Sequence, residues 1–158
     1  MRVTCLPAHI HNTPEKIPEA VRGKIRVARD TADKILVLFS DCGTGGKLAD
    51  VLREEEVESI GGAHCYEVFA GTENFTALMR DEPGCFFLTD FLVRHFDRFP
   101  KLRVTYFGHY GKLAYLAQRD DGELQDKARA AARRLGLDYE MRLTGYGGYR
   151  NFLARNCG

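Results

Sequence analysis

The stretch I-L-V-L-F-S-D-C-G-T-G-G, residues 35–46, decides the fold that the sequence predicts. Its apolar part, residues 35–39, has no polar interruption, a pattern typical of a strand buried on both faces of a parallel sheet. A polar, glycine-rich turn follows, and residues 47–55 then show helical periodicity. Because α/β proteins build their sites where a strand passes through such a turn into a helix, we expect site residues here.

Length, charge and cysteine content restrict the class of protein. The chain has 158 residues, with 23 Lys plus Arg against 22 Asp plus Glu and a formal net charge of +1. This predicts a single α/β domain over residues 1–158 and gives no support to binding of nucleic acid or an anionic membrane. No apolar run approaches a membrane span, and the N-terminus has no hydrophobic secretion segment, so we expect a cytoplasmic protein whose five cysteines are reduced thiols.

Strand and helix patterns alternate along the chain. Strands are expected at residues 3–6, 34–40, 58–63, 85–88 and 137–143. Helices are expected at residues 14–28, 46–56, 74–81, 91–99, 102–118 and 123–135, with a short terminal helix within 145–156. Asp90 is expected to cap the helix at 91–99, and Gly136 to close the helix at 123–135. The alternation predicts a three-layer sandwich around a mostly parallel sheet of about five strands.

Polar side chains follow the ends of the predicted strands. In chain order they are His9, His11 and Asn12; Asp41, Cys42 and Thr44; His64, Cys65 and Glu67; Thr89 and Asp90; and Thr144 and Tyr146. The carboxyl ends of parallel strands meet at one edge of a sheet, where ligands bind in such folds. We therefore expect the functional site at this edge.

The turn after residues 35–39 predicts a reactive thiol at Cys42. The main-chain amides of Gly43, Thr44, Gly45 and Gly46 are suited to hold an anionic group, because glycine lets the backbone approach a ligand and a helix N-terminus attracts anions. A thiol in that field has a lowered pKa, which suits nucleophilic chemistry, proton transfer or binding of a soft metal. The alternative is that Cys42 is a small buried residue in a tight turn.

His64-Cys65-Tyr66-Glu67 places an imidazole, a thiol, a phenol and a carboxylate in succession. Zinc and iron take Cys and His ligands, so the segment predicts a metal site or, alternatively, ordinary packing. Neighbouring residues on an extended strand point to opposite faces, so His64 and Cys65 reach one site only if the chain turns there, as Gly61-Gly62 would allow.

Six segments of the chain resemble a prokaryotic domain-of-unknown-function family. They are C-L-P-A-H-I-H-N-T-P-E-K-I, D-C-G-T-G-G, H-C-Y-E-V-F-A-G, F-F-L-T-D-F-L-V-R-H-F-D, Y-L-A-Q and T-G-Y-G. The resemblance covers nearly the whole chain and implies a small cytosolic α/β protein whose family often occurs in genomes with corrinoid-dependent methyltransferases. It marks as site residues Cys42, His64, Cys65 and Glu67, and also His11 and Asp90.

Two departures from the family pattern bear on the site. Family members usually begin with a further strand and helix containing a cysteine, which this chain lacks. They also carry extra residues, often with a G-L-G-L-D-like stretch, where Arg98-Phe99-Pro100 runs directly onward here. If that cysteine is a ligand or a catalytic group in the family, the first departure implies an incomplete or altered site. Loss of a terminal strand-helix unit would also expose a sheet edge and favour a homodimer.

Three functions remain open from the sequence. The first is binding of a metal or metallocofactor, zinc or iron, by Cys42, His64, Cys65 and His11, with Glu67 and Asp90 as proton-transfer groups and a looser link to corrinoid. The second is a metal-free thiol enzyme acting on a small anionic substrate, with catalysis by Cys42 and Cys65 through racemase-like proton transfer or a covalent adduct. The third is a non-catalytic accessory protein of a corrinoid methyltransferase system.

Overall fold

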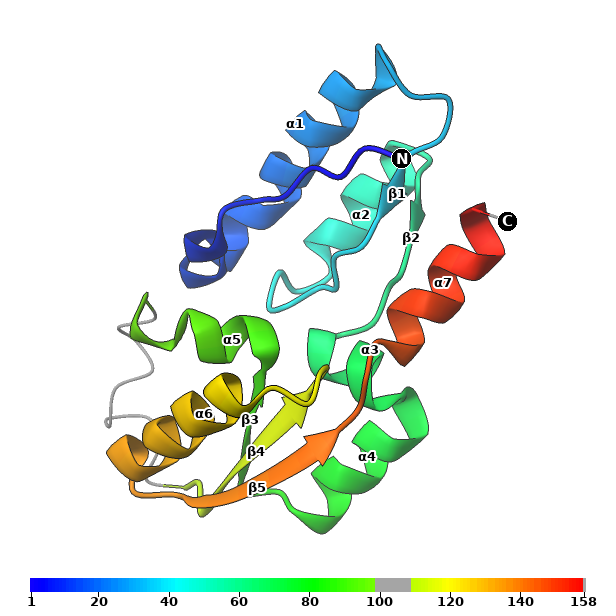
Figure 1. The fold of residues 1–158 in the computed structure, drawn as a ribbon. Coiled ribbons are helices and arrows are strands. Elements are labelled where there is room, and N and C mark those ends of the chain that lie inside the picture. The colour runs from blue at the N-terminus through cyan, green and yellow to red at the C-terminus, as the bar shows by residue number, and fades with distance from the viewer. Residues whose placement is uncertain (99–108, 158) are drawn as a thin grey trace. The chain divides into compact units, whose positions relative to one another are not determined.

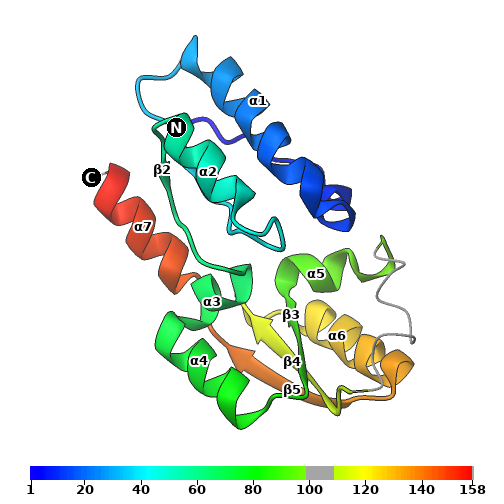
Figure 2. The same cartoon turned by 180° about the vertical axis from the view of Figure 1, so that it is seen from behind.

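The computed structural model describes residues 1–98 and 109–157, which divide into two compact units, Met1–Cys65 and Tyr66–Gly158 (Figures 1 and 2). In the first unit the elements are the 3-10 helices η1 (Ala8–Asn12) and η2 (Pro14–Lys16), the helices α1 (Ile17–Arg29) and α2 (Lys47–Glu54), and the strands β1 (Leu36–Val37) and β2 (Glu58–Ser59). The helix α3 (Cys65–Ala70) begins at the last residue of this unit. In the second unit follow α4 (Thr72–Asp81), β3 (Cys85–Thr89), α5 (Asp90–Arg94), η3 (Phe96–Arg98), β4 (Lys112–Ala117), α6 (Gly122–Leu135), β5 (Asp138–Leu143) and α7 (Gly147–Cys157).

The first unit is built around the packing of α1 against α2. Apolar residues recur on one face of each helix, as the sequence pattern predicts, and these faces meet in a shared core. The core residues are Ile10, Ile17, Val21, Ile25, Val37, Leu48 and Leu52. At the end of α2 the buried carboxylate of Glu55 pairs with Arg22, Arg26 and Arg29 of α1. The two helices are therefore joined by apolar burial and by an ion-pair cluster.

The strands of the first unit are short. Leu36 and Val37 of β1 pair in parallel with Glu58 and Ser59 of β2, and the main-chain amides of Asp41 and Cys42 bond to the carbonyl oxygens of Gly62 and Ala63 further along (3.0 and 2.9 Å). The predicted strand at 34–40 is thus present in its central part only. These backbone bonds hold the two predicted site segments side by side.

The second unit contains a parallel sheet in the order β3-β4-β5 with helices on both faces. Side chains that alternate along the strands face opposite layers, as strand geometry requires. The buried cluster with α5 and α6 includes Leu88, Val93, Leu113, Tyr115, Ala117, Leu124, Ala128, Ala131 and Ala132. The cluster on the other side comprises Leu78, Cys85, Phe87, Ala114 and Leu116, with residues of α3 and α4 packed against it. This unit therefore has the parallel sheet and the α/β class that the sequence predicts.

The ends of α6 follow the predicted capping signals. The Asp121 side chain accepts a hydrogen bond from the Leu124 amide (3.1 Å), which makes it the N-cap. Gly136 ends the helix with φ of 68°, the left-handed conformation that glycine adopts without a steric penalty. The predictions of α6 and of the edge strand β5 are confirmed.

Several sequence predictions need correction. The single sheet of about five strands is not found among the described residues, which form sheets of two and three strands. Residues 3–6 form no strand. Of the predicted helix at 102–118, residues 102–108 lie outside the described residues, and Lys112–Ala117 is the central strand β4 instead. A strand buried on both faces is apolar throughout, so its pattern resembles that of a buried helix.

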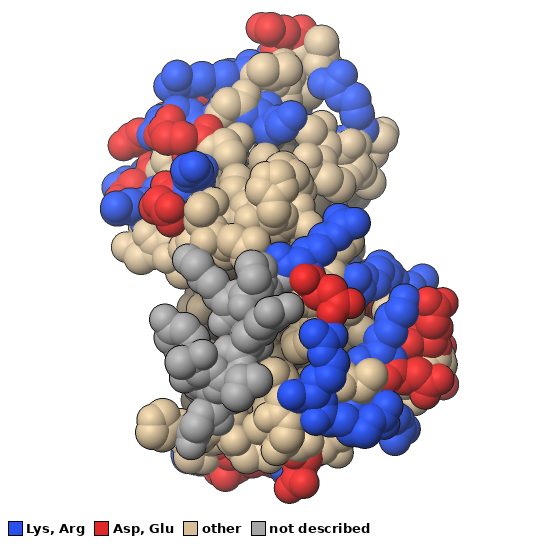
Figure 3. All heavy atoms as spheres, turned by 90° about the vertical axis from the view of Figure 1, so that its left-hand side faces the viewer, with Lys and Arg blue, Asp and Glu red and all other residues tan. Residues whose placement is uncertain are grey.

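Positive and negative side chains are interspersed on the surface. On the face drawn in Figure 3, Lys and Arg lie beside Asp and Glu in both units, which agrees with the balanced composition. Within residues 1–98 and 109–157, no helix combines the length and apolar character needed to cross a membrane.

Candidate active site

The turn at residues 41–46 is organised by the carboxylate of Asp41. Its Oδ1 accepts hydrogen bonds from the amide and the hydroxyl of Thr44 (2.6 and 2.7 Å), and its Oδ2 accepts one from the amide of Gly46 (2.7 Å). The Gly45 amide also bonds to it, and the hydroxyl and main-chain amides of the turn hold the pKa of Asp41 below its ordinary value despite burial. The Asp41 carboxylate is therefore an anion of the protein itself that accepts hydrogen bonds from the turn amides.

The Asp41 carboxylate occupies amides that were predicted to bind an external anion. The predicted residues are Gly43, Thr44, Gly45 and Gly46. The amides of Thr44, Gly45 and Gly46 already donate to Asp41. The Thr44 hydroxyl also accepts from the Leu48 amide (3.2 Å), which ties the turn to the first turn of α2. These amides thus stabilise the turn that carries Cys42.

Cys42 has a backbone conformation that is uncommon for a residue with a side chain. Its φ is 49°, and Gly43 follows with φ of 93°. The left-handed region costs a non-glycine residue on the order of 1 kcal/mol, which the Asp41 network and the bond from the Cys42 amide to the Ala63 carbonyl offset. Such strain is found where a side chain has to be presented in a defined direction.

His11 is held in place from two sides. Its Nδ1 lies 3.1 Å from the carbonyl oxygen of Ala8, which only accepts, so Nδ1 is the donor and Nε2 is available to Cys42. The ring stacks on Phe39, with 5.4 Å between centroids and 23° between planes. The hydrogen bond with Cys42 raises the pKa of His11 above its ordinary 6.5, against the opposing effect of burial.

Three side chains surround the sulfur of Cys42. Hydrogen bonds from Cys65, His11 and His64 lower the pKa of the Cys42 thiol from the ordinary 9.0 to about 3, although burial acts in the opposite direction. The hydrogen bond from Cys65 is the largest of these effects on the pKa of Cys42. The bond between Cys42 and His11 adds to it and is also the main cause of the raised pKa of His11, because a thiolate lies beside an imidazolium. Such a pair is the usual form of an activated cysteine nucleophile.

His64 and Cys65 both reach Cys42 because the chain turns between them. The predicted extended segment ends before them, and Cys65 is the first residue of α3. His64 is exposed and Cys65 is half-buried. The objection that neighbouring residues face opposite sides holds for a strand and does not apply at the start of a helix.

The geometry gives no support to the predicted metal site. Over residues 1–98 and 109–157, no group of three or more His, Cys, Asp or Glu side chains is arranged so that it could hold a metal ion. Cys42, His64, Cys65 and His11 are brought together around one sulfur atom by hydrogen bonds. This arrangement fits a thiolate with hydrogen-bond donors around it.

Comparison with known proteins agrees with the resemblance read from the motifs. The model of the family described as "Protein of unknown function (DUF1638)" matches residues 5–153. The chain belongs to this family. No curated protein and no solved structure gives a match. The DUF1638 description names no reaction, so the chemistry of this member has to be inferred from the geometry around Cys42.

Two predicted site residues of this DUF1638 chain, Glu67 and Asp90, lie in the second unit. Glu67, on α3, accepts a hydrogen bond from the Thr72 hydroxyl (3.0 Å). Asp90 is 4% exposed, and its Oδ1 accepts bonds from the Tyr115 hydroxyl (2.7 Å) and the Gln118 amide (3.0 Å). Asp90 thereby ties the end of β3 to the end of β4.

The expected capping role of Asp90 is wrong. Thr89 is the N-cap of α5, since its side chain accepts from the Leu92 amide (3.5 Å), and Asp90 is the first residue of the helix. The main-chain amide of Asp90 donates to the side-chain oxygen of Gln118 (2.8 Å). Asp90 is buried because its carboxylate has these partners within the core.

The remaining cysteines of the DUF1638 chain lie in other surroundings. Cys5 and Cys157 are exposed, and Cys85 is buried in the core of the second unit. Burial raises the pKa of the Cys85 thiol. Cys42 and Cys65 differ from these three in being joined to each other by a hydrogen bond.

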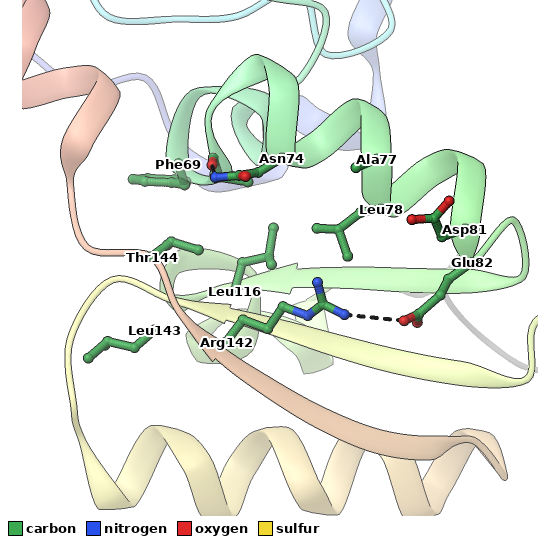
Figure 4. Close-up of a pocket in the computed structure, with 11 residues that line it drawn as sticks. Phe69, Asn74, Ala77, Leu78, Asp81, Glu82, Leu116, Arg142, Leu143 and Thr144 are labelled. Carbon is green, nitrogen blue, oxygen red and sulfur yellow. Dashed lines mark hydrogen bonds and ion pairs between the residues drawn. The ribbon is translucent and has the colours of Figure 1, made fainter.

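Sequence reasoning missed two features. The first is Asp41 as the internal anion of the turn, although an Asp three residues before a Thr in a glycine-rich turn is a known signal for such capping. The second is a pocket in the second unit, part of which is formed by Arg142 (Figure 4). The alternation in residues 138–143 already places Glu140 and Arg142 on one face of β5.

Proposed function

We propose that Cys42 is the nucleophile of a thiol-dependent enzyme that acts by covalent catalysis on a small substrate. The observation that carries this proposal is the convergence of Cys65, His11 and His64 on the Cys42 sulfur, with a pKa of about 3 for the thiol. The thiolate is the reactive form of cysteine, and here it is formed at neutral pH without a further activating step.

The low pKa favours a covalent adduct over racemase-like proton transfer. A thiolate whose pKa is lowered far below its ordinary value by three hydrogen bonds binds a proton weakly, which disfavours its taking one from carbon at neutral pH. The nucleophilicity of a thiolate falls only in part as its pKa falls. A thiolate of low pKa is also the better leaving group. Both properties suit a transient bond between Cys42 and the substrate.

His11 is suited to act as the proton donor for the leaving group. Its pKa is raised by the hydrogen bond with Cys42. When the sulfur bonds to the substrate it loses its negative charge, so this stabilisation of the imidazolium disappears and His11 releases its proton more readily. The proton passes to the departing group, and the Nδ1 bond to Ala8 keeps the ring oriented throughout.

The pH dependence of alkylation tests the proposal. In metal-free protein, iodoacetamide should modify Cys42 at a nearly constant rate between about pH 5 and 8, because the thiolate is already formed, whereas an ordinary thiol gains about tenfold per pH unit in that range. His11→Gln should restore part of the pH dependence. Peptide mapping separates Cys42 from the exposed Cys5 and Cys157, which serve as internal comparators.

Two outcomes would contradict the proposal. The first is labelling of Cys42 that rises tenfold per pH unit up to pH 8 in the wild type. The second is one equivalent of zinc or iron in gently purified protein that is lost in Cys42→Ser, which would favour the predicted metal site at Cys42, His64, Cys65 and His11. Elemental analysis therefore accompanies the alkylation experiment.

A further inference from the structure

A pocket of about 440 Å³ lies in the second unit between α4 and the face of the sheet formed by β4 and β5 (Figure 4). This volume is in the range of small-molecule sites, about 300–1,000 Å³. Phe69, Leu78 and Leu116 contribute apolar walls, and Asp81, Glu82 and Arg142 contribute charge. Figure 4 shows Asp81 and Glu82 at one end of the pocket, with the guanidinium group of Arg142 extending toward Glu82. Leu78 and Leu116 lie in the middle, and the polar side chains of Asn74 and Thr144 lie beside Phe69 at the other end.

Arg142 offers an unused donor to this pocket. Its Nε donates to Glu140 (2.5 Å) and its Nη2 to Glu82 (3.2 Å). Within the described residues Nη1 has no hydrogen-bond partner, and in Figure 4 this nitrogen points toward Leu78, into the pocket. An arginine fixed by two carboxylates with its third nitrogen unoccupied is suited to bind a carboxylate, since it loses little side-chain freedom on binding.

Asp81 offers the complementary acceptor. The carboxylate of Glu82 is occupied, because Oε1 holds Arg142 and Oε2 lies 2.9 Å from the Lys112 ammonium. Asp81 pairs with its sequence neighbour Arg80 (2.8 Å), and both side chains are well exposed. Exposed ion pairs of this kind contribute little free energy, so Asp81 exchanges Arg80 for a ligand cation at small cost.

We propose that this pocket binds an apolar α-amino acid. Asp81 receives the ammonium group, Nη1 of Arg142 donates to the carboxylate, and the side chain lies along Leu78, Leu116 and Phe69. The opposite charges at one end of the pocket match the two ends of the zwitterion, and the apolar walls match its side chain. Cys42 is not among the residues that line this pocket.

Isothermal titration with L-phenylalanine, 3-phenylpropanoate and phenethylamine tests the proposal on the full chain. L-phenylalanine should bind, and each analogue, which lacks one of the two charged groups, should bind about tenfold more weakly or worse. Equal affinity for the three compounds would overturn the proposal, as would the absence of binding by L-phenylalanine up to about 10 mM.

Two variants locate the binding. Arg142→Gln should weaken L-phenylalanine binding about tenfold or more, whereas Arg150→Gln, the same charge change on an exposed residue outside the pocket lining, should leave it unchanged. Because Arg142 also holds Glu82 and Glu140, Ala77→Leu is the second variant. Ala77 lines the pocket and is half-buried, so leucine fills space without removing a charge. Undiminished binding in Ala77→Leu would refute the assignment of the pocket.

Discussion

Replacing Gly148 by alanine tests how closely α7 packs against α3 in the second unit. A Cβ atom on Gly148 would lie 2.9 Å from Cγ1 and 3.1 Å from the carbonyl carbon of Val68, and nearer still to the Val68 carbonyl oxygen. The nearest of these atoms is backbone and cannot rotate away. The helices therefore have to separate by about an ångström or more before the contact with the Val68 carbonyl oxygen becomes ordinary.

Two opposing effects determine how much Gly148→Ala changes the free energy of unfolding. Overpacking of this kind costs about 1–3 kcal/mol, while alanine gains at most about 0.5–1 kcal/mol over glycine in a helix, and less near its start. We expect Gly148→Ala to lower the free energy of unfolding by about 1–2 kcal/mol, which is a fall in Tm of about 2–8 °C for a chain of this length.

Gly147→Ala is the matched control. It lies next to Gly148 at the start of α7, and a Cβ there meets nothing within 4 Å. Thermal and urea unfolding of the two variants, followed by circular dichroism, should show a loss of stability in Gly148→Ala only. If both variants unfold at the wild-type temperature, or if both lose stability equally, the close approach of α7 to Val68 is refuted.

Three further predictions concern the first unit. Asp41→Asn weakens the bonds from Thr44 and Gly46, so we expect a loss of about 1–3 kcal/mol in unfolding free energy and a steeper pH dependence of Cys42 alkylation. Glu56→Gly should raise Tm, because Glu56, the residue after the C-cap Glu55 of α2, has φ of 50°, a conformation that glycine adopts with about 1 kcal/mol less strain. The arginine partners of Glu55 lower the pKa of its carboxyl group in the folded state. The ionised carboxylate therefore stabilises the folded state above its ordinary pKa of 4.5, and this stabilisation is lost as the pH falls below that value. The Tm advantage of wild type over Glu55→Gln should therefore shrink on acidification, as measured by thermal unfolding at pH 7 and pH 3.5.

Each of these predictions has a contradicting result. Unchanged alkylation of Cys42 in Asp41→Asn would mean that the carboxylate does not organise the turn. A lower Tm for Glu56→Gly would show that its side chain contributes more than the backbone strain costs. A Tm difference for Glu55→Gln that stays constant or widens toward acid would contradict the ion-pair role of Glu55.

Many of the helices and turns could be predicted from short-range sequence patterns. Helix signals predicted α1, α2 and α6, and Gly136 marked the end of α6 because the left-handed cap is a local requirement. The glycines around Cys42 likewise indicated a special turn, since positive φ is a local property. The pairing of strands could not be predicted in this way, because an apolar run has no periodicity that distinguishes a strand from a buried helix. For this reason Lys112–Ala117 was expected to be helical and forms the centre of a sheet.

The sequence by itself determined that Cys42 lies in a glycine-rich turn and that two further thiols and three imidazoles occur in the first 65 residues. Tertiary structure alone decided that Cys65, His11 and His64 meet at the Cys42 sulfur, that Asp41 occupies the turn amides, and that Asp90 is held in the core of the other unit. The physical reason is that a pKa and a binding pocket depend on the distances between side chains far apart in the chain, and packing determines those distances.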